Sequence, residues 1–265
     1  YEAVHKIQGW EDLRRRLDQR DRRCFGFFHP AIGDEPLIFV EVALTKGIPD
    51  KIQPILANDH YDIEAPELAD SAAFFGISNC QVGLRGISFG NFLIKQVVQE
   101  LKQELPNLKN FVTLSPLPTF RDWLTRTYHA DSGLLTPEAQ AVLAELDNPE
   151  WASDPESSER LNEVIRPLAA RYLLKEKTSG NQPLNPVARF HLGNGAELHR
   201  INWLGDVSEN GMRQSAGLMV NYLYVLENIE KNNEKYAASG EIVCSSSVRE
   251  LSKLGRKLLQ GEREK

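Results

Sequence analysis

The sequence predicts a mixed α/β (α+β) protein in which strands and helices alternate around one core. Segments rich in Phe, Val and Ile, bounded by Gly and Pro, are typical of strands. An apolar residue at every fourth position indicates an amphipathic helix between two of these segments. A polar middle section carries helix-start signals and predicts a helical insertion into the α/β pattern.

The first half of the chain supplies most of the predicted strands. Residues 10–22 are typical of a short charged helix. Phe89, Leu93, Val97 and Leu101 recur every four residues and predict a helix from about 89 to 104. Prolines or glycines border the predicted strands, which lie at 24–28, 37–44, 72–80 and 110–118.

The second half is predicted to be mainly helical. We expect the helical insertion at about 119–182, within one domain that covers residues 1–265. The segment NPVARFHL predicts a short helix closed by Gly193 or Gly195, and AELHRINWL predicts a strand. Further apolar spacing predicts a long amphipathic helix over 212–235 and a last helix from 245.

Composition excludes several classes of function. A net charge of −6 argues against a nucleic-acid surface, and no apolar run is long enough to span a membrane. Cys24, Cys80 and Cys244 are odd in number and widely spaced, which favours reduced thiols in a cytoplasmic protein and no metal site. The first residue is Tyr1, so we expect that the chain was cut from a longer protein.

The first motif that suggests chemistry is RGISFGNFLIK, from Arg85 to Lys95, directly before the predicted amphipathic helix. Small residues let the backbone approach a ligand, and the N–H groups at a helix start bind phosphate. Taken alone, the glycines fit a plain tight turn better than a ligand site.

Two further motifs contain a candidate serine and two candidate histidines. Ser115 precedes Pro116 in TLSPLPTF, which favours an extended conformation, and no GxSxG elbow accompanies it. A serine at a strand end is usually structural. His191 and His199 lie on either side of a Gly-Asn-Gly turn, and a lone histidine is more often a satisfied core or surface residue than a catalyst.

These motifs resemble those of known families. RGISFG resembles the signature with which the GCN5-related N-acetyltransferase fold binds the pyrophosphate of coenzyme A, with Ser88 in place of the central glycine, and His191 matches the position of that fold's general acid. Together with YEAVHKI, EPLIFVEVALT, FVTLSPLPTF, PLNPVARFHLGNGAELHRINW and GLMVNYLY, they resemble the malonyl-CoA decarboxylase family from Tyr1 to about Glu227. The resemblance implies a GCN5-related mixed sheet with flanking helices.

The resemblance also implies a function and a site. It implies decarboxylation of malonyl-CoA to acetyl-CoA and CO2, with Ser115 and His191 as the catalytic pair and no cofactor. It implies a homo-oligomer assembled through an N-terminal helical domain that this chain lacks. The implied malonyl-CoA-binding loop consists of Arg85, Gly86, Ile87, Ser88, Phe89, Gly90 and Asn91.

The chemistry agrees with these residue types. The thioester carbonyl accepts the electron pair that CO2 leaves behind, so the protein must supply enolate stabilisation and a proton. A histidine with its ordinary pKa near 6.5 suits proton transfer, and we expect His191 to be the general acid and Ser115 to hydrogen-bond the substrate. Asn185 and Tyr224 are weaker pocket candidates, and core packing is at least as good a role for Tyr224.

Two other functions remain open at this point. A coenzyme A-dependent N-acyltransferase would share the Arg85–Gly90 loop, and an acyl-CoA sensor would bind without reacting. The arginine-rich run from Arg14 to Arg23 could reach the 3′-phosphate of coenzyme A, but a solvated helix face explains it better.

Overall fold

The computed structural model describes residues 4–5, 7–17, 19–57, 66–81, 83, 92–129 and 132–260. Over these ranges seven strands form one mixed sheet in the order β1-β2-β3-β4-β7-β5, with β6 paired to β7. The β3–β4 pair is parallel and all other pairs are antiparallel. The strands are β1 (Arg22–Phe28), β2 (Pro36–Thr45), β3 (Ser71–Asn79), β4 (Asn110–Thr113), β5 (Ser115–Pro116), β6 (Glu197–Asn202) and β7 (Met219–Leu223).

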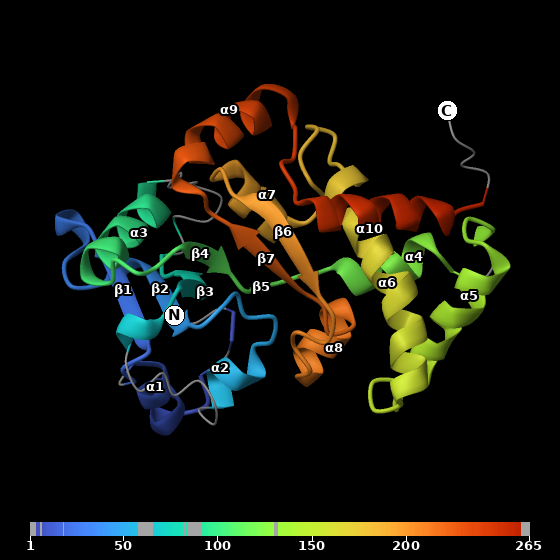
Figure 1. The fold of residues 1–265 in the computed structure, drawn as a ribbon, viewed down its shortest axis with the longest axis horizontal. Helices are drawn as coiled ribbons and strands as arrows, with labels where there is room; N and C mark the ends of the chain where they lie inside the picture. The colour runs from blue at the N-terminus through green and yellow to red at the C-terminus, as the bar shows by residue number, and fades with distance from the viewer. Residues whose placement is uncertain are drawn as a thin grey trace.

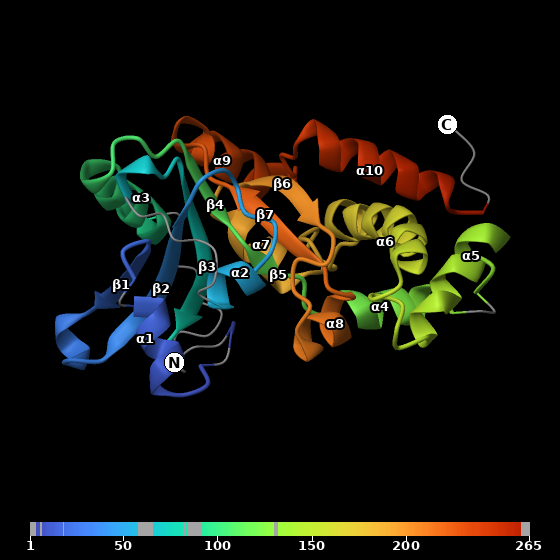
Figure 2. The same ribbon diagram turned by 60° about the horizontal axis from the view of Figure 1, so that its bottom comes forward.

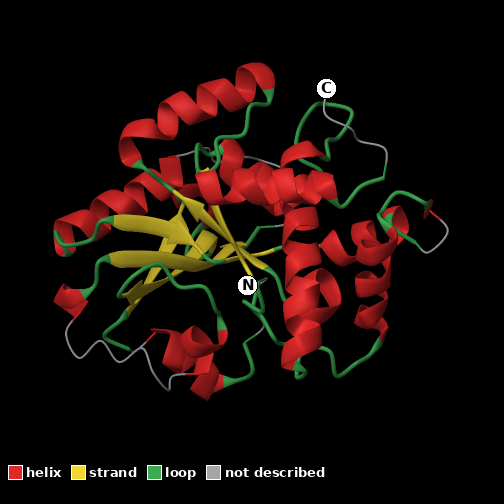
Figure 3. Cartoon of the chain, turned by 45° about the vertical axis from the view of Figure 1, so that its right-hand side comes forward, coloured by secondary structure: helices red, strands yellow, loops and turns green. Residues whose placement is uncertain are grey.

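Helices lie on both sides of the sheet and beyond one end of it (Figures 1 and 3), which confirms the predicted mixed sheet with flanking helices. In the described part of the chain, no helix combines the length and the apolar character needed to cross a bilayer. The helices are α1 (Trp10–Leu17), α2 (Gln53–Ala57), α3 (Phe92–Glu104), α4 (Phe120–Thr127), α5 (Pro137–Ala144), α6 (Pro155–Lys175), α7 (Pro186–Gly193), α8 (Glu209–Ser215), α9 (Ile229–Ser239) and α10 (Ser246–Lys257). Short 3-10 turns lie at Pro30–Ile32, Pro66–Leu68, Glu145–Asp147 and Leu226–Asn228.

The helices of residues 119–182 are α4, α5 and α6, which gather at one end of the sheet, with α10 packed across α6 (Figures 1 and 2). Thr136 caps α5 by accepting from the N–H of Ala139, and Asp154 caps α6 in the same way. Gly255 lets α10 approach α6 closely, because a Cβ there would lie 2.5 Å from the carbonyl oxygen of Pro167.

Side chains of the central strands alternate between two hydrophobic cores. Val42 and Phe74 belong to the main core, which includes residues of α3 and α6. Their neighbours Ala43 and Phe75 belong to a smaller core closed by Ile55 of α2. Because both faces of the sheet are covered, the strands read as continuous apolar runs.

The prediction of one long helix over 212–235 is wrong. The chain instead forms α8, β7 and α9, and Ala216 and Gly217 adopt left-handed backbone angles with φ of 51° and 76°. This conformation ends α8. Met219 and Val220 fitted a helical spacing but lie in the strand β7. The first four residues of β7 are buried on both faces of the sheet. The sequence therefore lacked the alternation of polar and apolar residues that would have indicated a strand.

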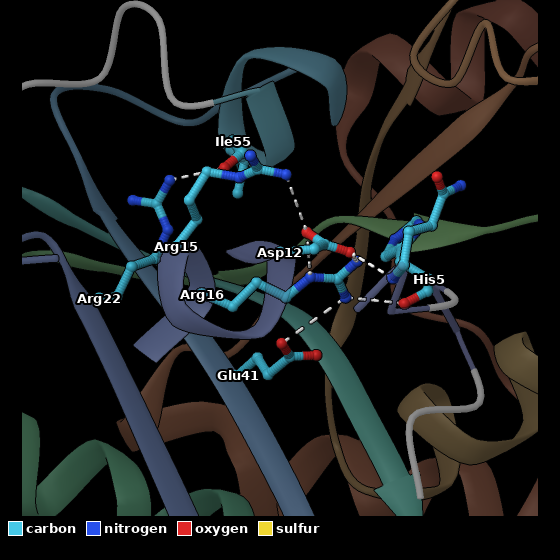
Figure 4. Close-up of polar contacts among 8 residues, drawn as sticks. His5, Asp12, Arg15, Arg16, Arg22, Glu41 and Ile55 are labelled. Carbon is cyan, nitrogen blue, oxygen red and sulfur yellow. Dashed lines mark hydrogen bonds and ion pairs between the residues drawn. The ribbon is translucent and has the colours of Figure 1, made fainter. Parts of the chain in front are cut away.

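The arginine run is also only partly the solvated face that the sequence favoured. Arg14, Arg15 and Arg20 are exposed, but Arg16 and Arg22 are buried. Figure 4 shows the two buried side chains in a polar cluster between α1 and the sheet.

Opposite charges and backbone carbonyls compensate these two buried guanidinium groups. Arg16 donates to both carboxylate oxygens of Asp12, lies 3.8 Å from Glu41 on β2, and donates to the carbonyl of His5 at 2.7 Å. Arg22 pairs with Asp21 and donates to the carbonyl of Ile55 at 2.6 Å. A buried charge is tolerated only with such partners, so these arginines anchor α1 and α2 to the sheet.

Candidate active site

Ser115 lies inside the sheet, where the strand next to β7 is interrupted between β4 and β5. β4 ends at Thr113, and β5 begins with Ser115, which pairs with Val220 of β7. Ser115 is in extended backbone and 5% exposed, as expected for a residue that precedes a proline. Its hydroxyl is therefore held by two strands rather than by a mobile loop.

His191 lies in the last turn of α7 and is 4% exposed. Asn185 caps this helix, because its Oδ1 accepts from the N–H of Ala188 at 3.0 Å. The same side chain donates through Nδ2 to the carbonyl of Pro118 at 2.8 Å, which ties α7 to the segment that follows Ser115. Asn185 is thus placed as a scaffold residue and is not among the described residues that line the cavity beside Ser115.

The fold brings Ser115, His191 and Tyr224 into one chain of hydrogen bonds. Ser115 Oγ lies 3.1 Å from His191 Nε2, and Tyr224 Oη lies 2.9 Å from His191 Nδ1. On the other side, Ser115 donates to Thr113 Oγ1 at 2.8 Å. Of the two residues that the sequence ranked as weaker candidates, Tyr224 therefore contacts His191 of the predicted pair directly.

Burial controls the proton affinities in this chain. Burial lowers the pKa of His191 from 6.5 to about 3, because no opposite charge compensates the imidazolium. Burial, with a contribution from Tyr222, raises the pKa of Tyr224 well above 10.0. The ring of Tyr222 also stacks on the imidazole at a centroid distance of 4.7 Å. The imidazole is therefore neutral in the ligand-free protein, which differs from the ordinary titration expected from sequence.

A cavity of about 600 Å³ lies beside Ser115 and His191, a volume typical of sites for small molecules. Its inner wall is mostly apolar, and its mouth includes Phe190, which is 38% exposed. The inner wall is formed by Ile38, Val40, Phe74, Ile94, Val97 and Leu114, and the mouth also by Gln182, Pro186 and Arg189. The lining is therefore mainly apolar beside Ser115 and His191.

The predicted malonyl-CoA-binding loop, Arg85 to Asn91, lies outside the described residues. The helix that follows it begins at Phe92, and Leu93 and Ile94 in its first turn line the cavity. The start of α3, which follows this loop directly in the sequence, is therefore at the cavity.

His199 lies on β6, as predicted, and is not part of the chain of hydrogen bonds that joins Ser115, His191 and Tyr224. Its Nδ1 is 3.9 Å from Glu197, and its side chain is 29% exposed. Over the described ranges, no three His, Cys, Asp or Glu side chains are arranged to hold a metal ion. All three cysteines are free thiols.

Sequence reasoning gave no role to Thr113 and Tyr222, although both stand in quoted motifs. Thr113 is the first residue of TLSPLPTF and Tyr222 lies in GLMVNYLY. A hydroxyl two residues before a strand-end serine lies on the same side of an extended chain, and this spacing was the available signal. Tyr222 carried no signal, because its strand was predicted as a helix.

Comparison with known proteins identifies the family. A family model described as malonyl-CoA decarboxylase C-terminal domain matches residues 1–263. The mitochondrial malonyl-CoA decarboxylase of Anser anser anser is 40% identical over 93% of this chain and 53% of its own length. The corresponding Mus musculus protein is 39% identical over 93% of this chain and 54% of its own length. The chain thus spans about half the length of the curated relatives it matches.

Solved structures agree with the sequence comparison. The crystal structure of malonyl-CoA decarboxylase from Agrobacterium vitis is 55% identical with a TM-score of 0.89, and the match covers 95% of this chain and 62% of that one. The one from Rhodopseudomonas palustris is 56% identical with a TM-score of 0.86, over 95% and 57% of the two chains. The resemblance seen in the sequence is therefore confirmed, and the chain belongs to the malonyl-CoA decarboxylase family, matching its C-terminal domain.

Proposed function

We propose that this chain carries the active site of a malonyl-CoA decarboxylase, a carboxy-lyase that converts malonyl-CoA to acetyl-CoA and CO2. The observation that supports this most is the hydrogen bond between Ser115 and His191 at the wall of an apolar cavity. The family to which the chain belongs supplies the substrate class.

The reaction follows from the chemistry of the substrate. The bond between the carboxylate and C2 breaks, its electron pair moves onto the thioester carbonyl, and an enolate forms. One proton is then added at C2, so each turnover consumes one proton from solvent. The apolar wall removes water from the carboxylate and favours its loss as uncharged CO2.

His191 is proposed to deliver this proton. Its pKa of about 3 means that the ligand-free imidazole is neutral. A malonyl carboxylate in the cavity adds the missing opposite charge, which raises the proton affinity of the imidazole and couples proton uptake to substrate binding. Ser115 is proposed to hydrogen-bond the carboxylate or the thioester, and Tyr224 to orient the ring.

The remaining expectations are proposals about the whole protein. We propose that the thioester carbonyl makes a further cofactor unnecessary, and that Arg85 to Asn91 holds the phosphates of the substrate. A homo-oligomer through an N-terminal helical domain and a role in fatty acid metabolism are proposed on the resemblance. The free thiols support a cytoplasmic location.

The test is to incubate the protein with malonyl-CoA and to follow acetyl-CoA and CO2 with and without an added amine. We expect CO2 release that does not depend on the amine. Ser115→Ala and His191→Ala should each lower turnover by about 10²- to 10⁴-fold while acetyl-CoA still binds. Acyl transfer to the amine without CO2, or binding with no turnover, would contradict the proposal.

A further inference from the structure

Thr113 lies where the pairing between β4 and β7 is interrupted. Val112 pairs with Leu223, and next to this pair the backbone N–H of Tyr222 donates to Thr113 Oγ1 at 3.1 Å. The carbonyl of Thr113 accepts from Asn221 Nδ2 at 2.8 Å. The backbone and the side chain of Thr113 are thus both bonded to β7, and Thr113 is 1% exposed.

The side-chain amide of Asn221 is itself fixed by several hydrogen bonds. Its Oδ1 accepts from Arg200 Nε at 3.0 Å and from Asn202 Nδ2 at 2.9 Å. Its Nδ2 donates to the carbonyl of Pro49 at 3.1 Å as well as to Thr113. Because this fully buried amide uses its oxygen and its nitrogen, it holds Thr113 in a fixed place.

The bond from Ser115 to Thr113 settles the direction of the neighbouring hydrogen bonds. Ser115 has one hydroxyl proton, and it donates this proton to Thr113 Oγ1. Ser115 Oγ then has only lone pairs for His191 Nε2, 3.1 Å away, so Nε2 must carry the proton of the neutral imidazole. Nδ1 is left bare and accepts from the hydroxyl of Tyr224.

We propose that Thr113 is a positioning residue that holds the hydroxyl proton of Ser115 and thereby fixes His191 in the Nε2–H tautomer. Without the threonine hydroxyl, Ser115 is free to donate to Nε2, and Nδ1–H then donates to Tyr224. Ser115, His191 and Tyr224 would remain in place, with the hydrogen bonds at both imidazole nitrogens reversed.

The consequence for the reaction rests on the proposed function. With Thr113 present, Nε2 presents a donor at the serine side, and in the ligand-free protein Thr113 accepts the hydroxyl proton of Ser115 until a substrate oxygen takes its place. With the tautomer reversed, Nε2 becomes an acceptor that cannot donate to the substrate until it gains a proton. Thr113 therefore affects turnover through the state of His191 and not through contact with the substrate.

The first measurement needs no variant and no substrate. Nitrogen-15 NMR of the imidazole nitrogens in the ligand-free protein at neutral pH distinguishes the two tautomers. We expect His191 to show a protonated Nε2 and a bare Nδ1. A protonated Nδ1 in the wild-type protein would overturn the proposal.

The second measurement compares Thr113→Val, which keeps the shape without the hydroxyl, with Thr113→Ser, which keeps the hydroxyl. Thr113→Val should shift the NMR signals toward Nδ1–H and lower kcat for malonyl-CoA at least about tenfold, with KM changed less than about threefold. Thr113→Ser should restore both the tautomer and most of kcat.

Thr45→Val is the matched control. Thr45 is equally buried on β2 and its hydroxyl bonds the carbonyl of Gly47, so its loss affects stability without reaching His191. If Thr113→Val showed the same His191 tautomer and the same kcat as the wild type, the inference would be refuted. If the wild-type protein releases no CO2, the proposed function fails, and the NMR comparison still decides the role of Thr113.

Discussion

Arg16 and His191 are buried to the same extent, each 4% exposed, but the groups around them differ in charge. Arg16 lies with the carboxylates of Asp12 and Glu41, which carry the opposite charge. His191 has hydroxyl partners only, and burial lowers its pKa to about 3, so it stays neutral.

The difference separates a structural cluster from the proposed catalytic one. The ions around Arg16 compensate one another and join α1 to β2 (Figure 4). The hydroxyl groups around His191 leave the imidazole without a counter-charge, and the cavity beside it has room for an anionic ligand. An uncompensated base next to a cavity responds to the charge of whatever binds there, whereas a compensated pair does not.

The largest expected effect comes from breaking the compensated cluster with Arg16→Met. Removing the guanidinium takes a buried charge partner from both Asp12 and Glu41, so the free energy of unfolding in urea should fall by about 3–5 kcal/mol. Arg16 also donates to the carbonyl of His5, and the neighbouring residue Val4 lines the cavity. We therefore expect KM to rise modestly and kcat per folded molecule to change little. Arg15→Met is the control, since its ion pair with Asp12 is 3.7 Å long and its side chain is 45% exposed. The control should cost less than about 1 kcal/mol, and an equal loss in both would contradict the comparison.

The next effect is a loss of stability in acid that originates at His191. Its folded pKa, about 3, lies below the 6.5 of the unfolded chain, so unfolding takes up a proton and stability falls as pH drops below 6.5. Between pH 7 and pH 4.5 this contribution is about 2–3 kcal/mol. Urea unfolding of wild type and His191→Gln at both pH values should show that much extra loss in wild type.

The carboxylates contribute at lower pH. Burial raises the pKa of Asp12, but hydrogen bonds from Arg16 and Gln8 outweigh it and hold that pKa below 3.8. The stabilisation by Asp12 is present above pH 3.8 and is lost only as the pH falls further.

Identical pH dependence of the wild type and His191→Gln between pH 7 and 4.5 would show that His191 is not the neutral group proposed.

A smaller effect is expected for Tyr224→Phe. Nδ1 of His191 loses its donor, which should cost about 1 kcal/mol of stability and lower kcat about tenfold. Tyr172→Phe makes the same chemical change at a fully buried tyrosine whose hydroxyl bonds Thr119 instead. Tyr172→Phe should cost similar stability and leave kcat near wild type. Equal kcat in the two variants would remove Tyr224 from the site.

The parts that could be predicted from sequence depend on local patterns. Ser115 before Pro116 was expected in extended backbone, and NPVARFHL was expected to be a short helix, since Asn and Pro start helices and Gly ends them. Both expectations are confirmed. The residues that form each of these signals lie within a few positions of one another, so each signal can be recognised in the sequence alone.

The parts that could not be predicted depend on pairs distant in sequence. No local pattern brings Tyr224 to His191, 33 residues away, or Arg16 to Glu41 on β2. The helix expected over 212–235 was wrong for the same reason, because the burial of β7 on both faces depends on neighbouring strands and helices. Tertiary context there overrides an apolar spacing that fits a helix.

The smallest expected effect is that of His199→Gln, which tests whether the environment and not the residue type makes His191 special. His199 is also partly buried, and burial lowers its pKa, but Glu197 opposes that shift. Its imidazole does not face the cavity lining, and its backbone carbonyl, which accepts from Ser245, remains in the variant. We expect turnover within about twofold of wild type and a stability change within about 0.5 kcal/mol, typical of a surface substitution. If His199→Gln lowered kcat as much as His191→Ala, proximity to Ser115 and an uncompensated charge would not be what selects the catalytic histidine.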